Sequence, residues 1–249
     1  PHRVRASTSI EKAAFFLRQL EGVEGVSVPR VLGYGREGTI EYVCETRMPG
    51  IAVRYADLDD SQRRTALAAL GRLLRRIHAV EQAPFFASDL MPGDRDHAAF
   101  IERFRAGFDR ALAGIAEEPD RWPLAVKAEA VVADVMGALP AEVALKALHS
   151  NPGPAHAFVD PGTGLLTGLI DFGDAYISHP AFDLRTWLRF GDRVDLLAGY
   201  RSESDVDDAF LQVWRAVMIL VEMTALAAGP RPERKAEAEQ VLRELLPEI

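Results

Sequence analysis

The chain has 249 residues, 48% of them hydrophobic and 27% charged, which fits a globular protein of one large domain or two packed lobes and excludes a disordered or fibrous one. The formal net charge of −8 excludes the basic footprint typical of nucleic-acid-binding proteins. The single cysteine excludes an internal disulfide and a cysteine-rich zinc site, and no uninterrupted apolar run approaches the length of a membrane span.

The first 50 residues are predicted to mix short strands with one helix. Any of Ser7, Thr8 and Ser9 can cap that helix, because a hydroxyl accepts hydrogen bonds from first-turn N–H groups. Pro49 and Gly50 end the pattern, so we predict a boundary there between a partial N-terminal lobe (residues 1–49) and a C-terminal lobe (residues 50–249). The predicted strands cover residues 3–6, 26–34 and 39–46, and the predicted helix covers residues 10–20.

The chain beyond residue 50 is predicted to be mainly helical. Apolar side chains recur at helical spacing, and we interpret these stripes as core rather than as cofactor contacts. Asp205, Asp207 and Asp208 suit a helix N-terminus, with an acidic wall for a cationic antibiotic as the alternative. One stripe runs Leu67, Leu70, Leu73, Leu74 and Ile77, another runs Phe210, Trp214, Val217 and Val221, and further helices are predicted over 97–112, 122–139 and 236–246.

A β-hairpin is predicted to interrupt these helices. Residues 155–159 and 165–170 are short and apolar, and the segment from Asp160 to Gly164 between them has turn chemistry. Polar groups lie at both mouths of this hairpin, in residues 149–156 and 170–174. Phosphoryl transfer needs such a convergence of an orienting group and carboxylate ligands for magnesium, so we predict a catalytic hairpin over residues 145–175.

These segments resemble the catalytic loop and the metal motif of the aminoglycoside/macrolide phosphotransferase family. The family's loop reads His-Gly-Asp, four residues, then Asn or His, and its metal motif reads Ile-Asp-Phe/Trp-Gly. Without gaps, His149 matches the His, Asn151 the catalytic Asp, His156 the Asn or His, and Asp171 the metal-binding Asp. Residues 28–35, 42–50 and 179–184 are similar to three further family segments, in the same order along the chain.

The resemblance implies an α+β, protein-kinase-like two-lobe fold, with a truncated small β-rich N-lobe and a large, mainly helical C-lobe. It implies transfer of the γ-phosphate of ATP or GTP, with Mg²⁺, to a hydroxyl of an antibiotic-like or metabolite acceptor, and hence a link to antibiotic resistance. Asn151 would orient the acceptor, while His156 and Asp171 would bind the metal. The residues implied at the nucleotide are Arg3, Ile170 and the backbone of Thr46 and Met48, and the structural residues are His149 and Asp183, the latter capping a helix and bracing the loops.

The catalytic loop departs from the family pattern at Asn151. An amide accepts a hydrogen bond from a hydroxyl but cannot take its proton. General-base catalysis is worth about 10²–10⁴-fold, whereas positioning and metal charge supply most of the rest in phosphoryl transfer. The sequence therefore predicts either a slow kinase or a pseudoenzyme that keeps the fold without chemistry. Ser150 and Pro152 differ from the pattern as well, which indicates natural divergence.

The phosphate side also departs from the pattern. No lysine lies on the opening strand, so Arg3, or alternatively Arg5, takes the place of the phosphate-clamping lysine. Strict register puts Ala13 at the position of the acidic partner, with Glu11 as a stand-in. Because nothing before Arg3 can supply the strands that cover the nucleotide, we expect the sequence to be truncated at its start, with disorder of those strands as the alternative. No signal-peptide pattern is present either, so the expected location is the cytoplasm.

Each candidate residue also has a purely structural interpretation. Asp171 can be a turn residue at a strand end, His156 a satisfied core histidine, and Asp174 either a loop brace or a second metal ligand. Cys44 is expected to be a small core residue. A protein kinase is the weakest alternative, because no activation segment separates Asp171 from Asp183. We expect neither a nucleic acid nor a membrane as partner, and the sequence leaves open the acceptor, the nucleotide and the oligomeric state.

Overall fold

The computed structural model describes residues 2–3, 9–38, 40–228 and 231–246, which divide into two compact units. The first unit comprises the residues up to Gly93 and those from Leu145 to Asp205, and the second comprises residues 94–144 and those from Val206 onward. Every predicted site residue belongs to the first unit. None of the breaks between the units falls at the predicted lobe boundary at residues 49 and 50, and that boundary stays a prediction.

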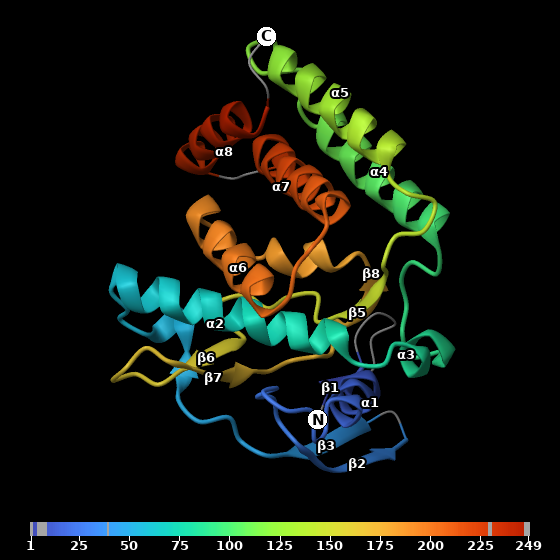
Figure 1. The fold of residues 1–249 in the computed structure, drawn as a ribbon, viewed down its shortest axis with the longest axis vertical. Helices are drawn as coiled ribbons and strands as arrows, with labels where there is room; N and C mark the ends of the chain where they lie inside the picture. The colour runs from blue at the N-terminus through green and yellow to red at the C-terminus, as the bar shows by residue number, and fades with distance from the viewer. Residues whose placement is uncertain (1, 4–8, 39, 229–230, 247–249) are drawn as a thin grey trace. The chain divides into compact units, whose positions relative to one another are not determined.

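The first unit opens with a three-stranded antiparallel sheet in the order β1-β3-β2, made of β1 (His2–Arg3), β2 (Val31–Glu37) and β3 (Ile40–Glu45) (Figure 1). Helix α1 (Ile10–Gln19) contacts β2 and β3. Its N-cap is Ser9, whose Oγ accepts the Lys12 N–H at 2.9 Å, whereas the other candidate caps, Ser7 and Thr8, lie outside the described residues.

Two predictions for this sheet are wrong. The strand expected from Val26 begins at Val31, since Pro29 has no N–H to donate and the Ser27 carbonyl instead accepts the Leu169 N–H at 3.1 Å. Cys44 is exposed rather than buried, because successive side chains of β3 alternate between the faces and Cys44 shares the outer face with Tyr42.

Two helices of the first unit pack with their backbones in contact. Helix α2 (Asp60–Ala79) buries all five residues of its predicted stripe, and Asp59 and Gln62 form a capping box at its start. Helix α6 (Phe190–Glu203) packs against it, with Gly71 facing Gly199 and its neighbours. A Cβ on Gly199 would lie 2.0 Å from the Ala68 carbonyl oxygen, so only glycine allows this approach.

We therefore expect the Gly199→Ala variant to lose about 1–3 kcal/mol of unfolding free energy, the usual cost of overpacking. Urea denaturation measures the loss. Gly191→Ala in the same helix is the matched control, since a Cβ there meets nothing within 4 Å. Equal stability of the two variants would contradict close α2–α6 packing.

The predicted hairpin is confirmed, and a second strand pair lies beside it. Strands β6 (Ala157–Val159) and β7 (Leu166–Leu169) pair antiparallel and are joined by β4 (Ile51–Ala52) into the sheet β4-β6-β7. The pair β5 (Lys146–Leu148) and β8 (Tyr176–Ser178) was not predicted. Because β6 pairs with β7 and β5 with β8, residues 149–156 and 170–175 are held side by side. We call these two segments the catalytic loop and the metal loop.

Short helical elements complete the first unit. These elements are η1 (Val53–Tyr55), α3 (Ala83–Ala87) and η2 (Pro180–Leu184).

Gly50 lies at the entry to β4 and has φ +85°, a conformation that favours glycine. A Cβ there would lie 2.2 Å from the Val159 carbonyl oxygen, so β4 can approach β6 closely at this point.

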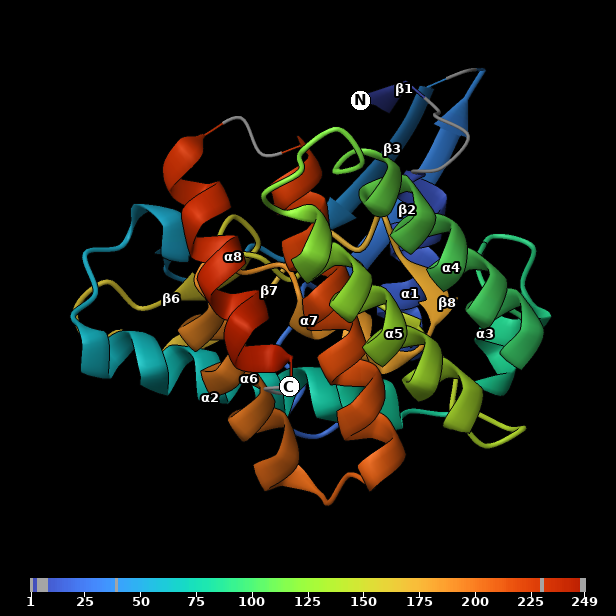
Figure 2. The same ribbon diagram turned by 90° about the horizontal axis from the view of Figure 1, so that it is seen from above.

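The second unit is helical. Its core helix, α7 (Asp208–Ala228), contacts α4 (His97–Ala113), α5 (Trp122–Ala138) and α8 (Pro232–Leu245) (Figure 1, Figure 2). Within the described part of the chain α7 alone has the length and apolar composition of a membrane span, but 56% of its most apolar window is buried, as in a core helix. Asp207 accepts the Phe210 N–H at 2.7 Å and so fills the predicted place at a helix N-terminus.

Candidate active site

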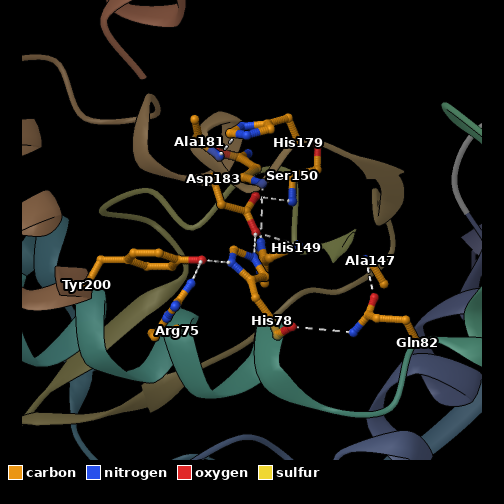
Figure 3. A network of polar contacts seen from close by, with 11 residues as sticks. Arg75, His78, Gln82, Ala147, His149, Ser150, His179, Ala181, Asp183 and Tyr200 are labelled. Carbon is orange, nitrogen blue, oxygen red and sulfur yellow. Dashed lines mark hydrogen bonds and ion pairs between the residues drawn. The ribbon is translucent and has the colours of Figure 1, made fainter. Parts of the chain in front are cut away.

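A buried carboxylate holds the start of the catalytic loop. Asp183 of η2 is fully buried, and its two oxygens accept the N–H groups of His149 at 2.8 Å and Ser150 at 2.7 Å (Figure 3). His78 Nε2 lies 3.0 Å from the same carboxylate. Burial by itself would raise the pKa of Asp183, but the hydrogen bonds from the His78 side chain and the His149 backbone oppose it, and the pKa is lowered. Asp183 therefore braces the loop as an ionised group.

The expected capping role of Asp183 is wrong. Asp183 lies inside η2, whose N-cap is His179, with Nδ1 accepting the Ala181 N–H at 3.3 Å. The carboxylate instead accepts the N–H groups of His149 and Ser150, the two residues that follow β5. Strand β5 was not predicted.

His149 connects the catalytic loop to the metal loop. Its Nδ1 accepts the Asn151 N–H at 3.2 Å, and its Nε2–H donates to the Ile170 carbonyl at 2.8 Å, which assigns the tautomer. Burial lowers the pKa of His149 despite the nearby Asp183 charge, so the neutral ring is favoured. The ring also packs edge-to-face on Phe172, with centroids 4.6 Å apart. These contacts are structural.

Ser150 adopts a left-handed backbone conformation, with φ +81°, at the position where the related loops have glycine. An L-residue pays about 1–2 kcal/mol for this conformation, which glycine adopts freely.

We expect the Ser150→Gly variant to gain about 1 kcal/mol of unfolding free energy, since the relieved strain exceeds the added entropy of the unfolded chain. Denaturant titration tests this. Ser61→Gly, in the first turn of α2, is the control and should lose about 0.5 kcal/mol. A destabilised Ser150→Gly variant would show that the Ser150 side chain outweighs the backbone strain.

His156 and Asp171 form a pair across the two loops. The His156 Nδ1–H donates to the Asn151 carbonyl at 2.7 Å, so a neutral ring presents a lone pair at Nε2. Asp171 Oδ2 lies 3.3 Å from that Nε2. Two acceptors at this distance require a proton or a cation between them. Asp171 also has φ +71°, a strained conformation of the kind that concentrates at functional sites.

This pair fits one particular kind of metal site. Within residues 2–3, 9–38, 40–228 and 231–246, no three His, Cys, Asp or Glu side chains are arranged to hold a metal together. Mg²⁺ characteristically takes one or two carboxylates and fills its shell with water and substrate phosphates. The residues present therefore fit Mg²⁺ bound between the protein and a nucleotide, and do not fit a closed protein site.

The backbone around Asn151 is fixed while its side chain is exposed. Both its N–H and its carbonyl bond to histidine rings, as described above. The Trp187 Nε1–H donates to the Pro152 carbonyl at 3.0 Å and anchors the next residue. Asn151, His156 and Asp171 are thus brought together in two adjoining loops of one unit.

Residues 46–48, which carry the predicted contacts with a base and which we call the hinge, meet the hairpin through Met48. A Cβ on Gly168 would lie 2.0 Å from Met48 Cε, so the methionine packs directly on β7, two residues before Ile170. The Thr46 N–H donates to the Arg30 carbonyl at 2.9 Å, so this donor is not available to a base. Arg3 lies on β1, paired with Ile40, and Arg5 lies outside the described residues.

Two charged residues near the site were missed by the sequence pattern. Lys12 of α1 is buried, which lowers its pKa against the opposing effect of Asp174. Lys12 is therefore a buried amino group of this helix, and the role of its neighbour Glu11 as the acidic stand-in stays a prediction. Glu45 is half-buried, and burial together with the Asp171 carboxylate raises its pKa. Glu45 directly precedes the hinge. Its position next to Thr46 was the sequence feature that could have indicated a place near the site.

Comparison with known proteins gives a consistent result. The model of the phosphotransferase enzyme family matches residues 1–220. Over 151 residues the chain is 27% identical to an aminoglycoside 3'-phosphotransferase of Streptomyces ribosidificus, an alignment that covers 60% of this chain and 53% of the relative. The chain thus spans about half the length of the curated relatives it matches.

Solved structures resemble the chain more extensively. The macrolide 2'-phosphotransferase MphH of Brachybacterium faecium aligns with a TM-score of 0.58 and 20% identity, over 96% of this chain and 81% of that one. A thermostable mutant of aminoglycoside phosphotransferase APH(4)-Ia aligns with a TM-score of 0.65 and 14% identity, over 96% and 83%. At these identities the likeness shows the fold, and the predicted α+β two-lobe architecture is confirmed.

Proposed function

The chain belongs to the phosphotransferase enzyme family, and on that premise we propose that it moves the γ-phosphate of ATP or GTP to a hydroxyl of a small molecule. The observation that carries the proposal is the 3.3 Å approach of His156 Nε2 and Asp171 Oδ2 beside the loop that bears Asn151. A cation at this pair and a hydroxyl at Asn151 are the two requirements of metal-assisted phosphoryl transfer.

Each residue of the site has a role in this proposal. His156 and Asp171 hold Mg²⁺, which when bound neutralises charge on the nucleotide phosphates. The Asn151 amide accepts a hydrogen bond from the acceptor hydroxyl and orients it, but cannot take its proton. The hydroxyl proton then passes to solvent instead of to residue 151.

On the nucleotide side, the Thr46 carbonyl and the Met48 N–H hold the base, Ile170 contacts it, and Arg3 neutralises phosphate. Structural relatives include an aminoglycoside phosphotransferase bound to ATP with streptomycin and another bound to GDP, so both purines are candidates. Arginine reaches phosphate with a broader, forked geometry than lysine.

Antibiotics of the aminoglycoside or macrolide type are the first acceptors to test, since the relatives act on both classes by name. The net charge of −8 favours encounter with a polycationic aminoglycoside. The cytoplasm is the proposed location, and antibiotic resistance is the biological role that would follow. The second candidate function is a nucleotide-binding pseudoenzyme, which the amide at position 151 favours.

Thermal unfolding with ATP or GTP, with and without Mg²⁺, tests the proposal. A nucleotide at about 100 times its Kd adds about 2.7 kcal/mol, which corresponds to about 5–10 °C for a chain of this size. We expect that shift only with Mg²⁺. We expect the Asp171→Asn variant to lose the shift even when Mg²⁺ is present.

Asp174→Asn is the matched control, because it removes a neighbouring exposed carboxylate of the metal loop and should leave the shift intact. Loss of the shift in both variants would identify Asp174 as a second ligand. Absence of any nucleotide effect in the unaltered chain would count against both the kinase and the pseudoenzyme.

A further inference from the structure

A continuous series of hydrogen-bonding groups lies behind the catalytic loop (Figure 3). Arg75 Nη1 donates to the Tyr200 hydroxyl at 3.3 Å, and that hydroxyl lies 3.0 Å from His78 Nδ1. His78 Nε2 in turn lies 3.0 Å from Asp183 Oδ2. The exposed fractions of His78, Asp183 and Tyr200 are 2%, 0% and 0%, so three of the four members are removed from water.

With a neutral His78 ring, the donors in this series can point in only one direction. An ionised Asp183 only accepts, so the His78 proton toward it sits on Nε2. The Nδ1 of a neutral ring then accepts from the Tyr200 O–H, while the Tyr200 oxygen accepts from the Arg75 guanidinium. Burial raises the pKa of Tyr200 to about 12 against the opposing effect of Arg75, so the phenol keeps the proton that it must donate.

We propose that His78 is a positioning residue for the catalytic loop, held by Tyr200 in the tautomer that donates to Asp183. Asp183 fixes the N–H groups of His149 and Ser150, and the left-handed backbone of Ser150 sets the place of Asn151. Without the donor from His78, the buried carboxylate loses this side-chain partner and keeps the two backbone N–H groups of the catalytic loop. The position of Asn151, the residue that orients the acceptor, is then less well fixed. The effect on turnover rests on the proposed function, but the effect on the loop does not.

Arg75 extends this series to the connector at the end of the first unit. The same guanidinium donates from Nε to Ser204 Oγ at 2.6 Å and from Nη2 to the Asp205 carbonyl at 2.9 Å. Asp205 is the last residue of the first unit before the chain enters α7. Arg75 thus joins the series to residues 204 and 205 by direct hydrogen bonds.

Residue-resolved NMR of the complete chain tests the proposal without requiring activity. At neutral pH the nitrogen shifts of His78 should report the Nε2–H tautomer. Tyr200→Phe removes only the hydroxyl, and we expect amide exchange at His149 and Ser150 to rise about tenfold, the effect of one lost net hydrogen bond. His78→Gln places an amide donor near the position of Nε2 and should restore protection that His78→Leu loses.

Arg76→Ala is the matched control. Arg76 precedes Ile77 on the same helix and binds Glu203 of α6 at 2.7 Å, outside the series. This variant should leave the two loop amides unchanged. Equal exchange in Tyr200→Phe and Arg76→Ala, or the opposite His78 tautomer in the unaltered chain, would overturn the proposal even if His78→Leu fails to fold.

Kinetics add an independent comparison. Where the unaltered chain transfers phosphate, Tyr200→Phe should lower kcat about 10–100-fold relative to Arg76→Ala, because misplacement of an orienting group costs rate. The Mg²⁺-dependent nucleotide shift should persist. A chain without any transfer activity would count against the proposed function, while the exchange data would still decide the role of His78.

Discussion

The Asn151→Asp variant is expected to transfer phosphate about 10²–10⁴-fold faster than the unaltered chain, the range that a positioned general base contributes. The N–H and carbonyl of residue 151 are each bonded to a histidine ring, so the backbone should be unchanged. An aspartate of the same shape adds an oxygen able to take the acceptor proton. Steady-state kinetics with ATP or GTP and a panel of aminoglycosides and macrolides measures the gain in kcat.

Asn151→Ala is the control for this experiment. It removes both the amide and any orienting hydrogen bond, so its kcat should fall below that of the unaltered chain. If Asn151→Asp retains the Mg²⁺-dependent nucleotide shift but gains no turnover, the base at position 151 is not what limits the protein, and the pseudoenzyme is favoured.

The Asp183→Asn variant is expected to lose about 3–5 kcal/mol of unfolding free energy, the usual cost of removing one partner from a buried charged network. An amide has one acceptor oxygen for the two backbone donors, and its NH₂ group faces an N–H at 2.7–2.8 Å. Chemical denaturation at neutral pH measures the loss. Because the folded-state pKa of Asp183 is lowered from its ordinary value of 3.8, its contribution is complete above that pH and is lost in more acidic solution.

Asp192→Asn provides the comparison, since Asp192 is also buried and binds Arg63 at 2.6 Å between α2 and α6. Both variants should be destabilised, but only Asp183→Asn should expose the amides of His149 and Ser150 to exchange. An Asp183→Asn variant within 1 kcal/mol of the unaltered chain would show that the carboxylate is not the brace of the loop.

The sequence was sufficient to predict both loops of the site. Their residues lie at fixed short spacings around a hairpin with clear turn chemistry, and local spacing determines which groups face one another. The strands β5 and β8 were missed because three residues each carry no readable alternation. Helix α6 was missed because its buried face includes Asp192, Arg193 and Gly199, so it lacks an apolar stripe.

The long-range polar contacts could not be predicted from the sequence. His78 and Tyr200 are 122 positions apart, and nothing in their local context indicates a hydrogen bond. The capping role expected for Asp183 was wrong for the same reason, since its partners lie more than 30 positions away. The burial of Lys12 and the exposure of Cys44 depend on which face of β3 receives α1, a tertiary choice that strand alternation alone leaves open.

Two hydrogen bonds to imidazole rings hold the backbone of residue 151, and this also bears on how such proteins can evolve. Backbone geometry there does not depend on which side chain the residue carries, so a lineage can exchange carboxylate for amide without disturbing its fold. Under the proposed function, an exchange of this amide for a carboxylate would supply the base without rebuilding the loop.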